Sequence, residues 1–382
     1  MGRIANHNLP GPTSLDGDVR HPSGDQSLHG DEITLIDLMA YPLGGRYQIL
    51  RQLNFGGFSH TFLAVDLHLP THPRCVLKQF KAPEGQNPIT QVIARHLFDH
   101  EAQILYELGS HPQIPTLLAH FEEDHEVYLA QEYIDGSRVC HQMELGKPWS
   151  ETRVVLLLQE VLEILAFVHR HHVIHRDVKP SNLIRRHRDG KVVLIDFGAV
   201  KRLRPVEGEM ATSEGADPAM AIGTRGYMPS EQRAGRPCFS SDVYAVGMMG
   251  IRALTGLRPH TLEKDATTQE IHWRPYAPEA SSRLKDVIDQ MVRRDYRDRY
   301  PTAQDALDAL QQLPNGFSSS IAHLYQTWYR GVGGLVPSPV STPGDTELVP
   351  TETADATAIT LAQEDTALLP VESIPTPPTG SG

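Results

Sequence analysis

Short runs of apolar, β-branched and aromatic residues dominate the first third of the chain. Four of these runs predict strands, at residues 46–53, 60–67, 74–80 and 126–134. Residues 91–108 stand between the third and fourth runs, and their pattern is typical of a helix. We therefore expect a small, mostly antiparallel sheet with one accompanying helix.

The pattern changes after Gly136, where apolar residues begin to recur at helical spacing. They do so at Leu157, Val161, Leu165 and Val168, and again within residues 243–254 and 284–291. The second part of the chain should therefore be mostly α-helical.

One hairpin should interrupt this helical part. Asp189 and Gly190 separate two strand-like runs, and an Asp-Gly pair predicts a type I′ turn, in which both central residues have positive φ. We expect this hairpin to bring Asn182 and Asp196 close together.

The two ends of the chain lack such patterns and carry most of its charge. The formal net charge is −12, with −4 in residues 1–45, −7 in residues 331–382 and about −1 in between. Residues 331–382 hold eight prolines and nine threonines, a composition that disfavours a packed core. We expect a flexible leader at 1–45 and a disordered acidic tail at 331–382.

Composition also limits the functional class and the location. The chain is 40% apolar and 21% charged, which suits a globular protein, and its acidity argues against broad nucleic-acid binding. Its three cysteines form no CxxC pair, and no apolar run reaches the length of a membrane span. We expect a cytoplasmic protein without a membrane span.

Two motifs carry the chemistry. The run HRDVKPSN at 175–182 is followed by DFG at 196–198, and this pair resembles the catalytic and magnesium loops of eukaryotic-like (Hanks-type) serine/threonine kinases. The runs CVLKQF and HPQIPTLLAHFEED look most like the bacterial kinases of cyanobacteria. The resemblance spans roughly 46–313. It implies an α+β, bilobal kinase fold, with a mostly β N-lobe at 46–133 and a mostly α C-lobe at 136–313.

The resemblance assigns roles to the charged residues. Asp196 and Asn182 would bind magnesium, with manganese as a possible substitute, while Asp177 would orient the substrate hydroxyl and Lys179 the transferring phosphate. Lys78 would hold the α- and β-phosphates of ATP. We expect Glu101 to hold Lys78 in place, and Glu107 is the alternative partner.

The phosphate-covering loop departs from the family pattern GxGxxGxV. Only Gly56 is kept, with Asn54, Ser59 and Thr61 at the other positions, although Gly57 can restore some backbone freedom. This departure bears on the affinity for ATP.

The same resemblance outlines an adenine pocket. Leu53, Thr61 and Val76 would form its roof, Ile184 its floor and Gln131 its back, and the backbone of Glu132 and Ile134 would pair with adenine. Core packing is the ordinary alternative for each apolar member.

Further residues match the end of an activation segment. Glu231 should form a buried pair with Arg299, Asp242 should brace the catalytic loop, and Thr224 with Lys179 indicates serine/threonine specificity. Phosphorylation of Thr212 or Ser213 could order the segment through Arg176, with Lys201 or Arg202; an uninvolved loop is the alternative.

Three other patterns have less specific readings. His96, His100 and Glu101 have metal-ligand spacing, but surface histidines are commoner than zinc sites. Arg185, Arg186 and Arg188 favour a solvated hairpin over docking of acidic substrates. The apolar positions in 314–330 predict a helix capped by Ser318, which either packs on the domain or forms a partner or self-association surface through 317–328. Those positions are Phe317, Ile321, Leu324, Tyr325 and Trp328.

We therefore expect a serine/threonine protein kinase that uses ATP and magnesium to phosphorylate protein hydroxyls, with autophosphorylation of its activation loop possible. One alternative is a pseudokinase, a binding or regulatory module of the same fold; the degenerate glycine loop favours it and the intact charged residues oppose it. A small-molecule phosphotransferase is a second alternative, opposed by Thr224 and Glu231.

Overall fold

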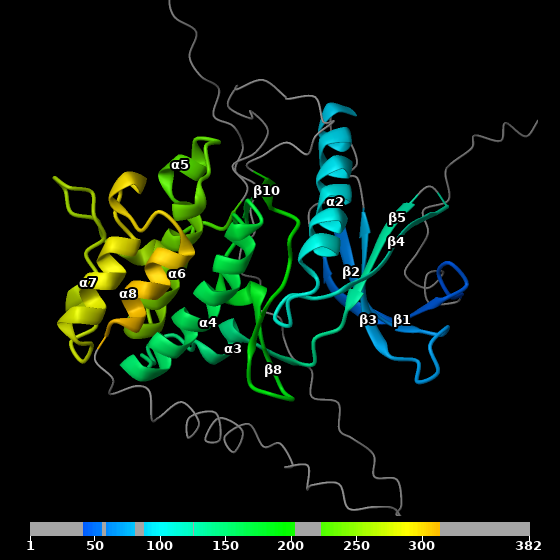
Figure 1. Cartoon of the computed structure of the whole chain (residues 1–382), viewed down its shortest axis with the longest axis horizontal. Helices are drawn as coiled ribbons and strands as arrows, with labels where there is room; N and C mark the ends of the chain where they lie inside the picture. Colours follow the sequence, from blue (N-terminus) through cyan, green and yellow to red (C-terminus); the bar gives the residue numbers. More distant parts are fainter. Residues whose placement is uncertain (1–40, 56–58, 81–87, 125, 203–222, 314–382) are drawn as a thin grey trace, which may run out of the picture.

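The computed structural model describes residues 41–55, 59–80, 88–124, 126–202 and 223–313. Most of the predicted leader, the predicted helix at 314–330 and the predicted tail lie outside these ranges. So do Gly56, Gly57, Thr212 and Ser213. Figure 1 shows two lobes side by side, one built around a sheet and the other mostly helical.

The first lobe contains a five-stranded antiparallel sheet in the order β1-β2-β3-β5-β4. Its strands are β1 (Tyr47–Phe55), β2 (Ser59–Asp66), β3 (Arg74–Phe80), β4 (Leu117–Glu123) and β5 (Glu126–Glu132). The four strands expected from the sequence are present, and β4 is an additional edge strand that the sequence reading missed. Its side chains alternate between half-buried and exposed, so it lacks the apolar run that marks the others.

The two faces of this sheet pack into different apolar clusters. Leu77 and Tyr128 belong to a small cluster on the outer face. Leu129 and Phe80 belong to the main core, which continues through α2 (Pro88–Leu108) into the helical lobe. Side chains alternate between the two faces of a strand. Side chains on the same face of the sheet as Leu129 therefore point toward the second lobe.

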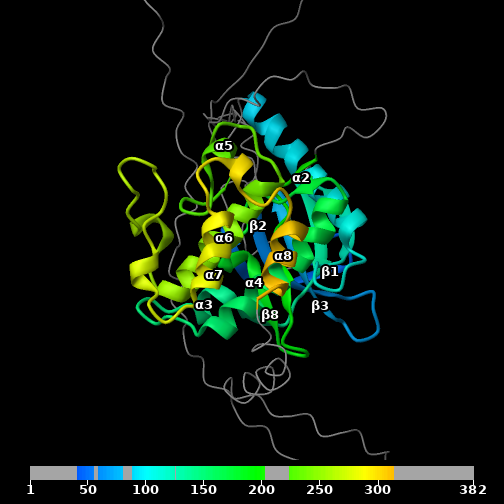
Figure 2. The same cartoon turned by 60° about the vertical axis from the view of Figure 1, so that its left-hand side comes forward.

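The helical lobe is organised around two long, largely buried helices. Its helices are α3 (Val139–Gln142), α4 (Glu151–Arg170), α5 (Ser230–Arg233), α6 (Phe239–Thr255), α7 (Ser282–Met291) and α8 (Ala303–Gln311), with short 3₁₀ turns at Pro180–Asn182, Pro259–Thr261, Arg274–Tyr276 and Tyr296–Asp298. Gly256 ends α6 at φ +67°, a left-handed conformation that glycine adopts readily. Figure 2 shows α4, α6 and α8 gathered at the centre of this lobe.

Short strands form two further small sheets. β6 (Gly136–Arg138), β8 (Leu183–Arg186) and β9 (Val192–Leu194) form one sheet, and β7 (Val173–Ile174) pairs with β10 (Lys201–Arg202). The hairpin β8–β9 confirms the prediction that Asn182 and Asp196 are neighbours, because the Ile195 amide donates to the Asn182 carbonyl at 2.9 Å.

The predicted type I′ turn is wrong. Of Asp189 and Gly190, only Gly190 has positive φ. The Arg186 amide donates to the Lys191 carbonyl, so the four residues between them form the connection. The longer connection relieves the need for positive φ at Asp189.

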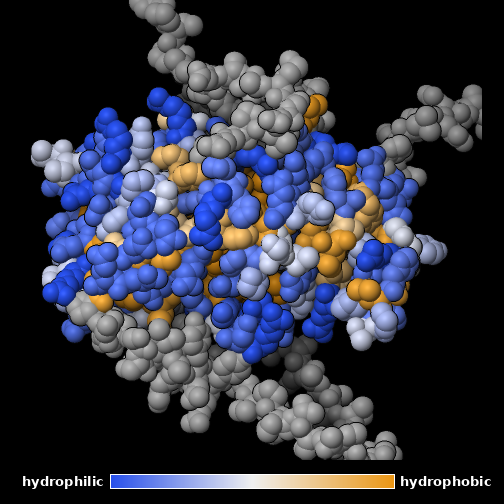
Figure 3. Space-filling view, in the orientation of Figure 1, coloured by the Kyte–Doolittle hydropathy of each residue, from blue (hydrophilic) through white to orange (hydrophobic). Residues whose placement is uncertain are grey.

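The surface in Figure 3 is mostly hydrophilic, and apolar side chains are most concentrated over the lobe that contains the five-stranded sheet. Among the described residues, no helix combines the length and the apolar character needed to cross a membrane.

Candidate active site

A buried cation stands between two carboxylates where the lobes meet. Lys78 lies on β3 and is 8% exposed; its Nζ is 2.5 Å from Glu101 Oε1 on α2 and 2.8 Å from Asp196 Oδ1. The Asp196 side chain remains 45% exposed, whereas that of Glu101 is 3% exposed. The carboxylate of Asp196 therefore remains accessible to a further cation.

The charges in this cluster shift one another's pKa. Burial alone would lower the pKa of Lys78, but the carboxylates of Asp196 and Glu101 outweigh it and raise that pKa. The Lys78 ammonium holds the pKa of Asp196 far below its usual range, while burial raises that of Glu101. Lys78 and Asp196 are therefore both charged at neutral pH.

Of the two glutamates considered for Lys78, Glu101 is the one in contact. Glu107 lies further along α2 and pairs with Arg202 on β10 at 2.6 Å. Gly198 allows α2 to approach, because a Cβ at that position would lie 3.0 Å from Glu101 Oε2.

A second cluster surrounds Asp177 in the loop that precedes β8. Its Oδ1 accepts from the Thr224 hydroxyl at 2.8 Å, and its Oδ2 is 2.9 Å from Lys179 Nζ. Lys179 also donates to the Thr224 hydroxyl at 2.7 Å. A carboxylate and an ammonium therefore hold one alcohol between them, which is the arrangement that a hydroxyl accepting a phosphoryl group requires.

Asn182 completes this cluster. Its Nδ2 donates to the backbone oxygen and Oδ2 of Asp177, at 2.9 and 3.0 Å. Its amide oxygen makes no hydrogen bond within the described chain. Together with Asp196 it offers hard oxygen ligands of the kind that Mg²⁺ prefers. The described residues contain no cluster of three or more His, Cys, Asp and Glu side chains suited to a metal.

Asp242 braces the catalytic loop from α6, as the sequence predicted. Its carboxylate accepts the amides of His175 and Arg176, at 2.8 and 2.9 Å, and faces His169 Nε2 at 3.1 Å. The other ring nitrogen of His169 accepts from the Ala303 amide at 3.2 Å. The link through His169 was missed, because no sequence spacing relates residues 169, 242 and 303.

Arg176 and Arg202, which were expected to bind a phosphate on the activation loop, both have other partners in the structure. Arg176 donates from Nε to the carbonyl of Ala199 and from Nη2 to that of Val200 at 3.1 Å. Arg202 pairs with Glu107, as described above. The proposed phosphate acceptors Thr212 and Ser213 fall outside the described residues.

The residues expected around a nucleotide lie on or next to strands of both lobes. Leu53, Thr61, Val76 and Ile184 are each partly exposed, on β1, β2, β3 and β8. Asn54 is exposed and Ser59 is partly exposed; residues 56–58, which stand between them in the sequence, lie outside the described ranges. Glu132 is partly exposed at the end of β5, and Gln131 and Ile134 are buried.

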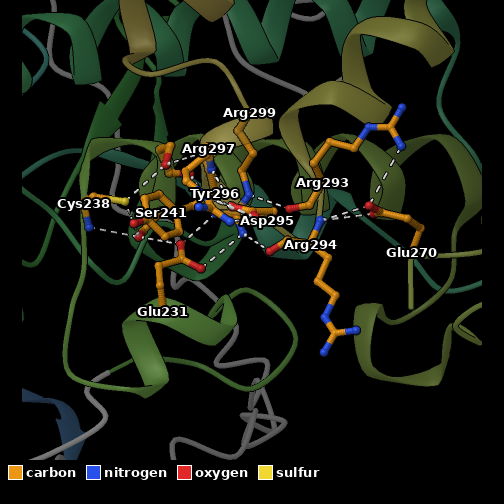
Figure 4. A network of polar contacts seen from close by, with 11 residues as sticks. Glu231, Cys238, Ser241, Glu270, Arg293, Arg294, Asp295, Tyr296, Arg297 and Arg299 are labelled. Carbon is orange, nitrogen blue, oxygen red and sulfur yellow. Dashed lines mark hydrogen bonds and ion pairs between the residues drawn. The ribbon is translucent and has the colours of Figure 1, made fainter. Parts of the chain in front are cut away.

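The predicted pair of Glu231 and Arg299 is confirmed. The guanidinium of Arg299 donates to both carboxylate oxygens of Glu231, at 2.7 and 3.2 Å, and to the Arg293 carbonyl at 2.6 Å. Figure 4 shows this network with Ser241, which also donates to Glu231 at 2.8 Å. The pair anchors α5, which follows Thr224, to the segment that precedes α8.

The prediction that the arginines of the hairpin are solvated is wrong for two of the three. Arg185 is 6% exposed and pairs with Glu160 at 3.0 Å, and Arg186 is 5% exposed and pairs with Asp189 at 2.6 Å. Arg188 alone among the three is exposed. Their carboxylate partners compensate the charges that burial would otherwise penalise.

Comparisons with known proteins place this geometry in context. The model of the protein kinase domain matches residues 47–310. Over 270 residues the chain is 43% identical to serine/threonine-protein kinase B of Synechocystis sp., covering 70% of this chain and 47% of that protein. It is 44% identical over 271 residues to serine/threonine-protein kinase PknA of Nostoc sp., with coverage of 70% and 47%.

A more distant relative is serine/threonine-protein kinase PrkC of Bacillus subtilis, 26% identical over 279 residues that cover 70% of this chain and 40% of that protein. The chain spans about half the length of the first two relatives.

Proposed function

Because this chain belongs to the protein kinase domain family, we propose that it transfers the γ-phosphoryl group of ATP to serine and threonine hydroxyls of proteins. The observation that carries the proposal is the alcohol of Thr224 held between Asp177 and Lys179. The names of the similar cyanobacterial proteins, which are serine/threonine kinases, support it.

Nucleotide phosphates would bind beside Lys78. Its ammonium is charged and fixed by Glu101, so it can meet phosphate oxygens without first losing the freedom of a flexible side chain. The roof and floor of the adenine pocket would be Leu53, Thr61, Val76 and Ile184, with Asn54, Gly56, Gly57 and Ser59 covering the phosphates.

Magnesium would be held by Asp196 and the amide oxygen of Asn182. When bound, it would neutralise charge on the phosphate oxygens. Asp196 is ionised and partly exposed, and Asn182 is fixed by its bonds to Asp177, so both ligands are ready to receive the ion.

Transfer itself would require positioning and charge neutralisation. The substrate hydroxyl would lie where the Thr224 hydroxyl meets Asp177 and would attack the γ-phosphorus as the bond to the β–γ bridging oxygen breaks. Asp177 would accept the hydroxyl proton, Lys179 would balance charge on the transferring group, and ADP would leave.

The intact charged residues oppose the pseudokinase alternative. The geometry places Lys78 against Glu101 and Asp196, and Asp177 against Lys179, so these groups meet in the arrangement that transfer needs. We therefore retain the active kinase as the proposal.

Several broader features belong to the same proposal. Residues 46–313 would form the catalytic domain, with the leader, the helix at 314–330 and the tail as appendages. Its cysteines are all free thiols, which favours a cytoplasmic location. Proteins with serine or threonine would be the substrates, and residues 317–328 are a candidate surface for a partner or for self-association.

A kinase assay with the full chain tests the proposal. Purified protein would be incubated with labelled ATP, Mg²⁺ and a generic protein substrate, beside Asp177→Asn and Asp298→Asn, an exposed control. Wild type and Asp298→Asn should yield phosphoserine and phosphothreonine, and Asp177→Asn almost none. Equal incorporation by wild type and Asp177→Asn would refute the mechanism, and none by wild type would restore the pseudokinase.

A further inference from the structure

The segment that begins beside Thr224 has an unbalanced charge on its surface. Residues 223–262 carry two carboxylates, Glu231 and Asp242, and both are buried, at 9% and 1% exposed. The same segment carries four arginines whose side chains are exposed and form no ion pair with a carboxylate of the described chain. These are Arg225, Arg233, Arg236 and Arg258. Exposed cations without neighbouring carboxylates create a positive potential that attracts acidic ligands.

Two of these arginines lie beside the loop that holds the alcohol of Thr224. Arg225 is the next residue in the chain, and Gly226 lies against the residue that follows Arg258, because a Cβ at Gly226 would be 3.0 Å from Pro259 Cβ. We call Arg225 and Arg258 the arginine pair. The pair therefore lies next to the position at which the proposed reaction takes place.

The chain itself contains a segment of complementary charge. Residues 331–382 hold seven acids and nine threonines, with no lysine or arginine. Thr346 is the one threonine among them with an acid on both sides, Asp345 and Glu347. If its hydroxyl took the position of the Thr224 hydroxyl, these two carboxylates would lie near the arginine pair.

The length of the chain allows this placement. Thr346 follows Leu313, the last described residue, by 33 positions. At about 3.3 Å per residue, an extended chain of that length spans up to about 110 Å. A domain of about 270 residues has a radius of gyration of only about 18 Å. Thr346 can therefore reach the active site of its own chain.

We propose that the arginine pair binds the acidic tail of the same chain and that Thr346 is phosphorylated there. This inference rests on the proposed function and specifies a substrate class for it, a threonine flanked by carboxylates. The Thr346 hydroxyl oxygen bonds to the γ-phosphorus of ATP as the bond to the β–γ bridging oxygen breaks. Asp177 accepts the hydroxyl proton, and ADP leaves. The arginine pair contributes by charge attraction to the bound tail.

The experiment follows phosphate on Thr346 in the full chain by quantitative mass spectrometry. Dephosphorylated protein is incubated with ATP and Mg²⁺. The double variant Arg225→Glu with Arg258→Glu should phosphorylate Thr346 on the order of tenfold more slowly than wild type, because attraction becomes repulsion. Equal rates in the two proteins would overturn the inference.

Arg283→Glu is the matched control. Arg283 lies on α7, is exposed and likewise forms no ion pair with a described carboxylate. This variant changes the charge by the same amount per site but away from Thr224 in the chain, so its rate should stay within about twofold of wild type. A loss as large as that of the double variant would overturn the inference, since net charge alone would then account for both.

Reversal of the tail charges separates charge attraction from damage to the loop. Asp345→Lys with Glu347→Lys should slow phosphorylation of Thr346 when the arginine pair is intact. The same tail should recover most of the lost rate when it is combined with Arg225→Glu and Arg258→Glu. Absence of recovery would overturn the inference, because the arginines would then act through the structure of the loop.

Two further readings identify the source of the tail and the origin of a failure. Tenfold dilution of the protein should leave the fractional rate unchanged, whereas a rate that falls in proportion would assign the tail to a second copy and overturn the proposal. If wild type phosphorylates an added generic protein but not Thr346, this inference alone is overturned. If it phosphorylates neither, the proposed function is overturned as well.

Discussion

Asp242 accepts the backbone amide of Arg176 at 2.9 Å, and Arg176 holds a left-handed φ of +67°. Residues other than glycine seldom adopt this conformation, so the loop needs external support. The buried carboxylate supplies it from α6. The turn that aims Asp177 at Thr224 therefore depends on a residue 65 positions away in the chain.

Asp242→Ala tests this support. The variant leaves two buried amides unpaired, and we expect the free energy of unfolding to fall by about 3 kcal/mol. Kinase activity should fall further than stability accounts for, since the loop is no longer held. Urea unfolding followed by fluorescence gives the first quantity, and a kinase assay below the unfolding transition gives the second. Wild-type activity in a folded variant would contradict the prediction.

The motifs around Asp177 and Asp196 were predictable from sequence because charged residues at fixed spacing have few alternative uses. Strands with continuous apolar runs were also predictable, since burial on both faces demands them. β4 was missed because an edge strand of alternating polarity resembles a loop in a single sequence.

The errors arise from contacts between distant parts of the chain. Arg185 is buried because Glu160 on α4 meets it, and the sequence spacing of 25 residues gives no sign of this pair. The turn at Asp189 was misjudged because the pairing of Arg186 with Lys191 sets the loop length. The roles of His169 likewise depend on tertiary packing alone.

Glu101→Gln tests the ion pair at Lys78. Loss of the charge leaves Lys78 with Asp196 as its sole carboxylate in this cluster, so the ammonium should shift toward Asp196 and away from the phosphates. We expect kcat/KM for ATP to fall by on the order of tenfold or more.

Glu107→Gln is the matched control for this variant, because it lies on the same helix and pairs with Arg202 instead. Its kcat/KM should stay within about threefold of wild type, as expected for a partly exposed pair. Equal losses in the two variants would show that the Lys78 pair has no particular role.

The contribution of His175 to stability should fall as the pH is lowered from 7 toward 5.5. Burial lowers the pKa of His175, so the unfolded chain, whose histidine has a pKa of about 6.5, takes up a proton that the folded chain does not. The unfolded state is thereby favoured below that pH, at up to about 1.4 kcal/mol per pH unit for this residue. His111, whose pKa burial also lowers, adds a loss of the same sign.

His175→Phe should reduce the dependence of stability on pH, because it removes the titrating group. The phenylalanine ring can keep the contact with Phe197, whose centroid lies 4.9 Å from that of the His175 ring. Urea unfolding at several pH values gives the slope for wild type, His175→Phe and the exposed control His96→Gln. Asp196, whose pKa the Lys78 ammonium lowers, contributes its own loss only below about pH 4. Identical slopes in wild type and His175→Phe would rule out the assignment.

Arg299→Met should weaken the fold more than any exposed arginine variant. It removes the two bonds to Glu231 and leaves that carboxylate, which is 9% exposed, with the Ser241 hydroxyl as its remaining side-chain partner among the described residues. Breaking a buried pair in this way costs about 3–5 kcal/mol.

Arg297 offers the comparison, because it also pairs with a carboxylate, Asp295, but lies in solvent with 74% of its side chain exposed. Arg297→Met should change the free energy of unfolding by less than about 1 kcal/mol. The double variant Glu231→Gln with Arg299→Met should recover part of the loss, since no unpaired charge is then buried. If the double variant is more stable to chemical denaturation than Arg299→Met, the unpaired Glu231 carboxylate accounts for the lost free energy of unfolding. If the losses of the two single variants add, packing around Arg299 accounts for it instead.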